Sequence, residues 1–199
     1  MTITLRPHQH NALEAMQKYN KGQVIIPTGG GKTICMIKDA KAQFDCDGPT
    51  RIVVVAPRIL LAEQLCKEFL ELIDNAAVFH VHSGETEHFS STKPAYIERW
   101  CKQAYRNQLI FTTYHSLHRI QEAGIAVDTI YFDEAHNSVQ RNFFPPTEHF
   151  AADADRCYFF TATPKHSVTV FKPGMNDGAV YGQVICNVPA PKLVEEGYI

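Results

Sequence analysis

Short runs of mainly apolar residues recur along this chain, and stretches with the periodicity of amphipathic helices separate them. Each run is nearly continuous in apolar character, which is typical of strands buried on both faces of a parallel sheet. Strands that alternate with helices in this way predict an α/β fold with a doubly wound, mostly parallel sheet. Ligands of such sheets bind at the carboxyl ends of the strands, so the residues directly after each run are the first candidates for a functional site. The runs are residues 23–26, 51–55, 77–81, 109–112, 129–132 and 157–160.

The stretches between the runs predict helices, and two irregular regions predict loops. Helical periodicity covers residues 7–19, 32–44, 60–72, 95–105 and 115–122. Residues 83–94 are polar, and residues 142–155 contain the pair Pro145-Pro146, so both predict loops. Near the end of the chain, residues 179–188 predict a short strand.

The composition is that of an ordinary globular domain. Hydrophobic residues make up 45% of the chain and the formal net charge is -2, so no overall basic charge attracts nucleic acid. A local basic or polar track would still be enough for nucleic-acid binding. No apolar run approaches the roughly 18–20 residues of a membrane span, and the polar N-terminus carries no signal-peptide core. We therefore expect no membrane partner and a location in the cytoplasm or at the nucleoid.

The cysteines and histidines form no sequence pattern typical of a metal site. The 6 cysteines are scattered, without a CxxC pair or zinc-like spacing, and we interpret them as reduced thiols. His80 and His82 alternate at a predicted strand end, but no acidic residue or cysteine is close to them in the sequence. Histidines at a strand end or on the surface are therefore the preferred interpretation, and a metal site is the alternative.

A glycine-rich segment joins the first run to the helix after it. Three successive glycines let the backbone turn its N–H groups toward an anion, and the following helix presents the positive end of its dipole there. Lys32 would reach the β- and γ-phosphates of ATP, and the Thr33 hydroxyl would bind Mg²⁺. The usual phosphate-loop pattern has glycine where this chain has Ile26, and the alternative is a turn that only connects strand to helix. The segment consists of Pro27, Thr28, Gly29, Gly30, Gly31, Lys32 and Thr33.

A second motif, Asp133-Glu134-Ala135-His136, directly follows the run at 129–132. Asp133 is placed to hold Mg²⁺ through water, and Glu134 is placed to polarise the water that attacks the γ-phosphate. Two adjacent carboxylates are costly unless a cation is present, which itself supports a metal. We expect His136 to couple the state of the phosphate to neighbouring segments rather than to bind the metal. Together with Lys32 these residues form the predicted catalytic group, and a solvated acidic turn is the alternative.

The order of these and further motifs resembles the superfamily 2 helicases and translocases of the DEAH type. The resemblance is greatest to the group related to the motor subunit of type III restriction enzymes and to phage DNA helicases, and it extends from about Leu5 to Ile199. It implies a RecA-like P-loop fold, which is a three-layer sandwich with a mostly parallel central sheet. It also implies that residues 1–190 form the ATP-binding first lobe and that residues 191–199 begin a linker to a second lobe.

The resemblance assigns roles to several other segments. Arg6 and Gln9 would bind the adenine, with Gln9 using both ends of its amide. Coupling of hydrolysis to movement would fall to Thr161, Ala162 and Thr163, which would contact the acidic motif through His136. Each short segment taken alone can also be a helix cap or a turn. The residues that would contact the nucleic-acid backbone are Pro57, Arg58, Ser83, Gly84, Thr112, Thr113 and Tyr114.

The function implied by the resemblance is that of an ATP-dependent helicase or translocase, with DNA favoured over RNA as the partner. The motor subunit of a restriction system is a second hypothesis, and a non-catalytic ATP-dependent binding module is a third. Glu134 argues against the third, because a pure switch has less need of a carboxylate that polarises water. The second lobe would supply the arginine fingers, so we expect these residues alone to bind ATP weakly and to hydrolyse little of it.

Overall fold

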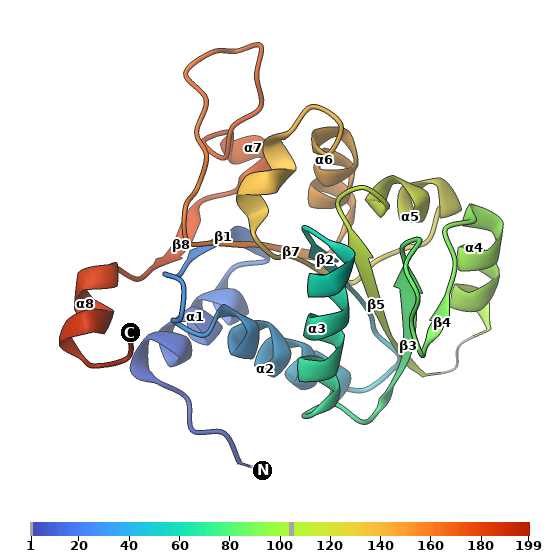
Figure 1. Cartoon of the computed structure of the whole chain (residues 1–199), viewed down its shortest axis with the longest axis horizontal. Helices are drawn as coiled ribbons and strands as arrows, with labels where there is room; N and C mark the ends of the chain where they lie inside the picture. Colours follow the sequence, from blue (N-terminus) through green and yellow to red (C-terminus); the bar gives the residue numbers. More distant parts are fainter. Residues whose placement is uncertain (1, 104–105) are drawn as a thin grey trace.

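The computed structural model describes residues 2–103 and 106–199. Within these residues, a sheet of eight strands runs through the molecule in the order β4-β3-β5-β2-β6-β7-β1-β8 (Figure 1). Every pairing in it is parallel, so each strand returns to the sheet through a crossover connection. The strands are β1 (Lys21–Ile25), β2 (Arg51–Ala56), β3 (Ala76–Val81), β4 (Phe89–Ser90), β5 (Asn107–Thr113), β6 (Thr129–Phe132), β7 (Arg156–Thr161) and β8 (Val184–Asn187).

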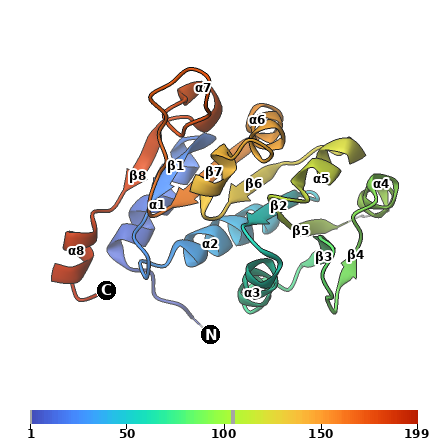
Figure 2. The ribbon, with the colours of Figure 1, turned by 45° about the horizontal axis from the view of Figure 1, so that its top comes forward.

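Helices cover both faces of the sheet and make three layers (Figure 2). One face carries α1 (Pro7–Lys18), α2 (Lys32–Phe44) and α3 (Ile59–Leu70), and α8 (Ala190–Glu195) joins their core. The other face carries α4 (Pro94–Lys102), α5 (Leu117–Ala123), the 3₁₀ helix η1 (Ala135–Val139), α6 (Phe144–Asp153) and α7 (Gly178–Tyr181). This architecture confirms the predicted α/β fold with its parallel central sheet.

The two cores explain why the strands read as continuous apolar runs. Along β2, Ile52 and Val54 pack beneath α1, α2 and α3, whereas Val53 and Val55 pack beneath the opposite layer. All four side chains are fully buried. A strand that helices cover on both faces is buried throughout, so its sequence lacks the alternation of apolar and polar residues that a half-exposed strand shows.

Most predicted elements lie where the sequence placed them, and their ends differ by at most three residues. The predicted helix over residues 95–105 corresponds to α4, and its last two residues lie outside the described part of the chain. The predicted loop at residues 83–94 contains one short exception, because Phe89 and Ser90 pair with Phe79 and His80 to form β4 at the edge of the sheet.

The loop predicted at residues 142–155 was wrong, because most of this segment is helix α6. Pro145 and Pro146 lie in its first turn, where backbone N–H groups have no partner inside the helix, so the prolines remove no hydrogen bond. The buried residues Thr147, Phe150 and Ala151 recur at helical spacing and hold this helix against the sheet.

The strand predicted at residues 179–188 was wrong in its first half. Residues Gly178–Tyr181 form the single turn α7, whose first N–H groups are capped by Asp177 through a 3.1 Å bond from the Ala179 N–H. Gly182 then takes a φ of +67°, which ends the turn before β8 begins at Val184. A capping side chain and one glycine thus decide where the chain changes from helix to strand.

The register of the parallel strands brings the ends of the strands to one edge of the sheet. Ala56 at the end of β2 pairs with Thr113 of β5, and Val55 pairs with Phe132 of β6. Ile25 at the end of β1 pairs with Thr161 of β7. The motifs that follow these strands therefore meet along a single carboxyl edge. Among the described residues, no helix has the length and apolar character needed to cross a membrane.

Candidate functional site

The glycine-rich segment forms a tight loop between β1 and the N-terminus of α2. Gly29 and Gly31 both have φ of +83°, a conformation that side chains with a Cβ rarely adopt, and the Gly30 N–H closes a turn onto the Pro27 carbonyl at 2.9 Å. Gly31 is the N-cap of α2, and Lys32 and Thr33 are the first residues of that helix. The loop therefore stands at a helix N-terminus, which is a favourable place for a phosphate group.

The start of α1 supports this loop from one side. The His8 Nε2 atom lies 2.6 Å from the Gly30 carbonyl oxygen, and the Gln9 Nε2 atom donates to the same oxygen at 3.2 Å. The Gln9 Oε1 atom accepts from the Arg6 backbone N–H at 2.8 Å, and the Arg6 guanidinium donates to the Gly29 carbonyl at 3.3 Å. Arg6 and Gln9 thus lie at the phosphate loop, although both ends of the Gln9 amide bond to the protein itself. Their role at an adenine stays a prediction.

The last residues of the chain also pack on the loop, which the sequence did not indicate. Residues 190–195 form α8, whose Leu193 is fully buried, and the chain then folds back so that the Tyr198 N–H bonds to the Leu193 carbonyl at 2.9 Å. The Arg6 guanidinium lies 4.9 Å from the centre of the Tyr198 ring. In Figure 1 this segment lies beside α1. No local motif marks Tyr198 as part of the site, because its neighbours there are nearly 200 residues away in the sequence.

The acidic motif meets the phosphate loop through an ion pair. The Lys32 Nζ atom lies against Glu134 Oε1, and the two residues are 102 positions apart in the sequence. Glu134 has φ of +48°, the only positive value among the non-glycine residues that the structure describes. Such strain persists only where the surroundings enforce it, and it is common at functional sites. Here it turns the Glu134 side chain toward Lys32.

Asp133 lies deeper at the same edge, and its surroundings suit a cation. Its side chain is nearly buried, and its carbonyl oxygen accepts a 2.7 Å bond from the Tyr114 hydroxyl. Burial raises the pKa of the Asp133 carboxyl from 3.8 to about 6, against the lowering effect of Lys32. The neighbouring carboxylate of Glu134 raises this pKa as well. A divalent cation beside Asp133 would offset both unfavourable effects, so the residues present fit a Mg²⁺ site.

His136 connects the acidic motif to the segment after β7. Its Nδ1 atom lies 2.9 Å from the Thr161 hydroxyl and 3.6 Å from Glu134 Oε2. The Thr163 N–H donates to the same hydroxyl at 3.1 Å, and Ala162 lies between them in the turn. Burial lowers the pKa of His136, so the ring is neutral at pH 7. Of the three predicted coupling residues, Thr161 therefore contacts the acidic motif directly, and Thr163 is linked to it through the Thr161 hydroxyl. Their role in coupling stays a prediction.

The residues predicted to contact nucleic acid fall into two groups. Arg58 and Ser83 are exposed after β2 and β3, and Pro57 and Gly84 beside them are partly exposed. A Cβ on Gly84 would lie 2.5 Å from the Ile59 side chain, so this turn packs directly on the start of α3. The four residues remain a candidate contact surface.

The second group lies inside the protein, so its role at nucleic acid stays a prediction that its burial does not support. Thr112, Thr113 and Tyr114 are buried, with exposed fractions of 0%, 3% and 1%. The Thr112 hydroxyl donates to the Val81 carbonyl at 2.8 Å, and the Tyr114 hydroxyl supports Asp133. The hydroxyls of Thr112 and Tyr114 thus have hydrogen-bond partners inside the protein. All three side chains are covered, so none is exposed to a nucleic-acid strand in this structure.

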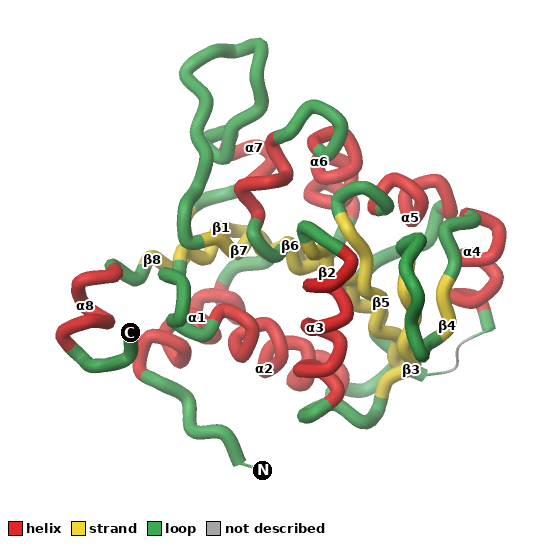
Figure 3. The backbone as a smooth tube through the Cα atoms, in the orientation of Figure 1, coloured by secondary structure: helices red, strands yellow, loops and turns green. Residues whose placement is uncertain are grey.

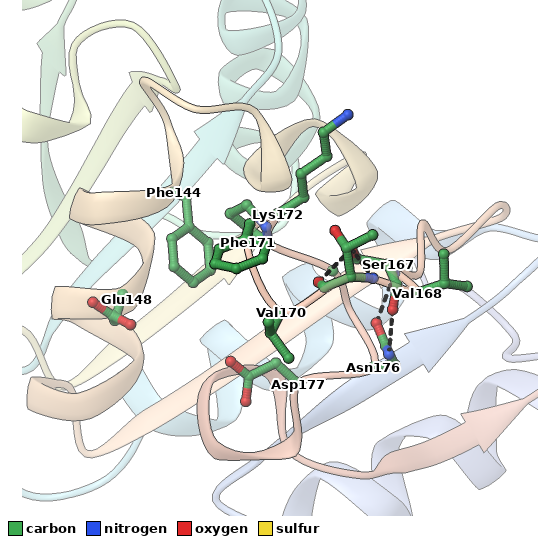
Figure 4. A pocket seen from close by; sticks show the side chains of 12 residues that line it. Phe144, Glu148, Ser167, Val168, Val170, Phe171, Lys172, Asn176 and Asp177 are labelled. Carbon is green, nitrogen blue, oxygen red and sulfur yellow. Dashed lines mark hydrogen bonds between the residues drawn. The ribbon is translucent and has the colours of Figure 1, made fainter.

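A recess away from these motifs lies under the loop that follows β7. This loop projects from the body of the molecule (Figure 3), and its base is held by two bonds between Asn176 and the Ser167 backbone, at 2.8 and 2.9 Å (Figure 4). Phe144 and Glu148 of α6 form the opposite wall. None of the predicted catalytic or phosphate-binding residues lines this recess, so we assign the functional site to the carboxyl edge of the sheet instead.

Comparisons with known proteins agree with this fold. The family described as "Type III restriction enzyme, res subunit" matches residues 2–166. No curated protein sequence is significantly similar to the chain.

Solved structures of similar fold include two Type ISP restriction-modification enzymes. A nuclease-deletion mutant of LlaGI, in complex with a DNA substrate mimic, matches with a TM-score of 0.81 and 23% identity over 98% of this chain and 21% of that one. LlaBIII bound to DNA matches with a TM-score of 0.82 and 21% identity over 99% of this chain and 16% of that one. The chain therefore spans about a fifth, or less, of the length of these proteins.

A third solved structure is the Hef helicase domain from Pyrococcus furiosus. It matches with a TM-score of 0.61 and 20% identity over 82% of this chain and 34% of that one. These likenesses confirm the predicted RecA-like fold. Because the family match covers most of the sequence, the chain belongs to the family of the type III restriction enzyme res subunit, within the superfamily 2 helicases.

Proposed function

We propose that this chain is the ATP-binding lobe of a motor that moves along nucleic acid as it hydrolyses ATP. The observation that carries the proposal is the meeting of Lys32, Glu134, His136 and Thr161 at one edge of the sheet. The phosphate loop, the acidic motif and the segment after β7 supply these residues, and each contacts the next in the series. Membership of the family supports the same conclusion.

The ion pair between Lys32 and Glu134 defines a resting state in this proposal. Each side chain neutralises the other, so Glu134 is not available as a base while Lys32 holds it. When the ammonium of Lys32 moves to a phosphate group, the Glu134 carboxylate becomes free to accept a proton from water. Mg²⁺, held by Thr33 and Asp133, would supply positive charge beside the phosphates when bound. The lysine thus makes the activity of the base depend on the presence of the nucleotide.

The contact between His136 and Thr161 supports a route from hydrolysis to movement. His136 lies within 3.6 Å of Glu134 and within 2.9 Å of Thr161, so a change at Glu134 reaches the end of β7 through one side chain. The neutral ring can accept a hydrogen bond from the Thr161 hydroxyl. We propose that this bond is the element through which the nucleotide state biases the neighbouring loop.

DNA is the nucleic acid that we propose as partner. Two of the structural neighbours are complexes with DNA or a DNA mimic, and the family takes its description from a restriction enzyme. The candidate contact surface consists of Arg58 at the N-terminus of α3 and the adjoining turn at Ser83 and Gly84. Helix N-terminal amides and one arginine suit contacts to phosphate, which would be independent of sequence and sensitive to salt.

We also propose that residues 1–190 form the first lobe of a two-lobed protein and that residues 191–199 begin the connection to the second. The small share of the Type ISP enzymes that the chain spans supports a larger parent protein. The packing of α8 and Tyr198 on the phosphate loop would place this connection next to the nucleotide. A second lobe that closes on the site could then act on the nucleotide and on the connection together.

A motor subunit of a restriction system is the second candidate function, and the family description and the two restriction-modification neighbours favour it. It differs from a free-standing helicase in what the parent protein carries rather than in this lobe. Cleavage of DNA by the complete protein, dependent on ATP hydrolysis, would distinguish the two.

The experiment that tests the proposal measures ATP hydrolysis by the complete protein with no nucleic acid, with duplex DNA, with single-stranded DNA and with RNA. We expect DNA to stimulate hydrolysis more than RNA does, and the stimulation to weaken as salt increases. Hydrolysis that no nucleic acid stimulates would refute the motor. Stimulation by RNA alone would refute the choice of DNA.

A further inference from the structure

A cluster of metal-binding side chains lies outside the nucleotide site, between α3 and the edge of the sheet. Glu63 and Cys66 project from α3 one turn apart, and His80 and His82 come from β3 and the residue after it. His88 precedes the edge strand β4. We call these five residues the His80 cluster. The sequence indicated a metal site only as an alternative for His80 and His82, because Glu63 and Cys66 are at least 14 positions from either of these strand histidines.

On one side of the cluster a carboxylate oxygen faces two histidine rings. The Glu63 Oε1 atom lies 3.4 Å from His80 Nδ1 and 3.2 Å from His82 Nε2. The Gly84 N–H donates to His82 Nδ1 at 3.1 Å, so the proton of a neutral His82 is on Nε2 and faces the carboxylate. His82 Nε2 lies 3.1 Å from His80 Nδ1 and donates to it, so the proton of a neutral His80 lies on its other nitrogen, Nε2.

That arrangement leaves His80 Nε2 as a buried N–H group without an acceptor, and a metal ion would replace its proton. The His80 side chain is fully buried, and its Nε2 atom has no hydrogen-bond partner among the described residues. Buried polar atoms are normally satisfied, so an orphan atom of this kind needs an explanation. One potential ligand atom each from Cys66, His80 and His88 lie within 4.8 Å of one another, and the His80 and His88 rings stack with centroids 5.3 Å apart.

We propose that the His80 cluster binds a zinc ion through the Cys66 thiolate, His80 Nε2 and a ring nitrogen of His88. One thiolate and two imidazoles suit Zn²⁺, and water would complete a tetrahedral set. Glu63 would hold His80 from behind, in the carboxylate–histidine–metal arrangement that orients metal-bound histidines. The ion would bind the orphan nitrogen of His80 and would give the partly buried carboxylate of Glu63 a cationic neighbour.

The distances require only a small adjustment. Ligand atoms on one zinc ion lie about 3.3–3.8 Å apart, so the three side chains must close by about 1 Å. His88 is half-buried in the loop before β4, where a rotation of its ring displaces no core residue. Cys66 and His80 are fixed in the core and form the rigid part of the site.

Two other interpretations of the cluster fit the structure less well. A redox-active cysteine is disfavoured, because the Cys66 side chain is only 1% exposed and solvent oxidants do not reach it. A site made of Glu63, His80 and His82 would need the lone pair of His82 Nε2, but the bond from the Gly84 N–H puts the proton on that atom.

The position of the site gives it a structural purpose. It joins α3, which begins next to Arg58, to the strand that leads into Ser83 and Gly84. The Gly84 N–H itself bonds to His82 of the cluster. A bound ion would therefore hold the two halves of the candidate nucleic-acid surface in a fixed relation, independently of the nucleotide.

The test is a titration of the metal-free chain with Zn²⁺ and, for its spectrum, with Co²⁺. We expect one equivalent to bind, and Co²⁺ to show the charge-transfer band of a cobalt–thiolate bond. Cys66→Ser should abolish the band, whereas Cys101→Ser, a buried cysteine outside the cluster, should keep it. His88→Ala should remove tight binding, whereas His10→Ala, on the surface, should not. Glu63→Gln should weaken binding about 10- to 100-fold.

His88→Ala keeps the experiment decisive if Cys66→Ser does not fold, because His88 is only half-buried. Circular dichroism of each variant checks the fold before titration. No stoichiometric binding by the wild-type chain would overturn the proposal. Binding that survives Cys66→Ser and His88→Ala but is lost in His82→Ala would overturn the assigned ligands.

Discussion

Asp133 and Glu134 are adjacent in the sequence, but their carboxylates have different surroundings. Glu134 is partly exposed and paired with Lys32, whereas Asp133 is nearly buried and its pKa is raised to about 6. Such a pair can divide two tasks, because the partly exposed Glu134 carboxylate can contact water, whereas a bound cation would stabilise the buried Asp133 carboxylate. The difference comes from the backbone, which turns at Glu134 through a positive φ.

The raised pKa of Asp133 predicts how the stability of the metal-free protein depends on pH. The folded state holds the proton of this carboxyl more tightly than the unfolded state does, so ionisation costs stability as pH rises from about 4 through 6. Asp133→Asn removes this cost, and the variant should gain up to about 3 kcal/mol relative to the wild type over that window. Urea unfolding of both proteins at several pH values, with a chelator present, measures the gain. A difference that does not change with pH would contradict the assignment.

Gly31 allows a sharp test of the phosphate loop. An alanine there must adopt a φ of +83°, and its Cβ would lie 2.3 Å from Gln9 Nε2. Gly48→Ala is the matched control, because Gly48 has a φ of +88° and nothing within 4 Å of such a Cβ. We expect Gly48→Ala to cost about 1 kcal/mol of stability, and Gly31→Ala to cost about 2–4 kcal/mol.

The readouts are the free energy of unfolding and the affinity for ATP. Gly31→Ala should also weaken ATP binding, whereas Gly48→Ala should leave it unchanged. Adding Gln9→Ala to Gly31→Ala should restore part of the lost stability by removing the clash. Equal costs for the two glycine substitutions would show that Gln9 does not pack on the loop as described.

At the opposite edge of the sheet, a buried ion pair joins several elements. Asp39 of α2 accepts two bonds from the Arg156 guanidinium at the start of β7, at 2.7 and 2.8 Å, and one from the Tyr131 hydroxyl of β6. Arg156 also donates to the Met16 carbonyl of α1 at 3.2 Å. This network joins α1, α2, β6 and β7 at the edge of the sheet opposite the candidate functional site. It stabilises that edge, whereas the strained and exposed groups lie at the carboxyl edge.

Removal of Asp39 should therefore be costly. Asp39→Ala leaves the Arg156 charge buried without its partner, and we expect a loss of about 3–5 kcal/mol in the free energy of unfolding. Glu122→Ala, which breaks an exposed contact to Arg119 of 3.6 Å, should change it by less than about 0.5 kcal/mol. Urea unfolding measures both. A small effect of Asp39→Ala would mean that water reaches the pair.

The sequence predicted those parts of the fold and the site that depend on local pattern. Buried strands appear as continuous apolar runs, and the phosphate loop consists of adjacent residues, so both could be read directly. Helix α6 was missed because Pro145 and Pro146 predicted a loop. The position of these prolines in the first turn of a helix is known only from the structure. The sequence placed Lys32 and Glu134 in one site but did not indicate their ion pair. It also did not indicate the place of Tyr198 or the approach of Glu63 and Cys66 to His80, because these residues meet only through the topology of the sheet.

In the molecule as a whole, the buried Asp39–Arg156 network and the candidate functional site lie at opposite edges of the parallel sheet. The order of the strands puts β1, β7, β6 and β2 side by side, so the phosphate loop, the coupling segment, the acidic motif and the start of α3 follow one another along one edge. A change at Glu134 is therefore close both to Lys32 of the phosphate loop and, through His136, to Thr161 after β7. This arrangement is what a lobe that converts hydrolysis into movement requires.

The most direct test of this account is the rate of ATP hydrolysis by the complete protein in the presence of DNA, with Glu134→Gln compared with the wild type. Glu122→Gln serves as the control, because Glu122 lies on α5 and its only described ionic contact is the exposed one to Arg119. We expect Glu134→Gln to lower kcat by at least about 100-fold while ATP binding persists. The control should hydrolyse ATP at the wild-type rate. Hydrolysis by Glu134→Gln at the wild-type rate would contradict the central claim.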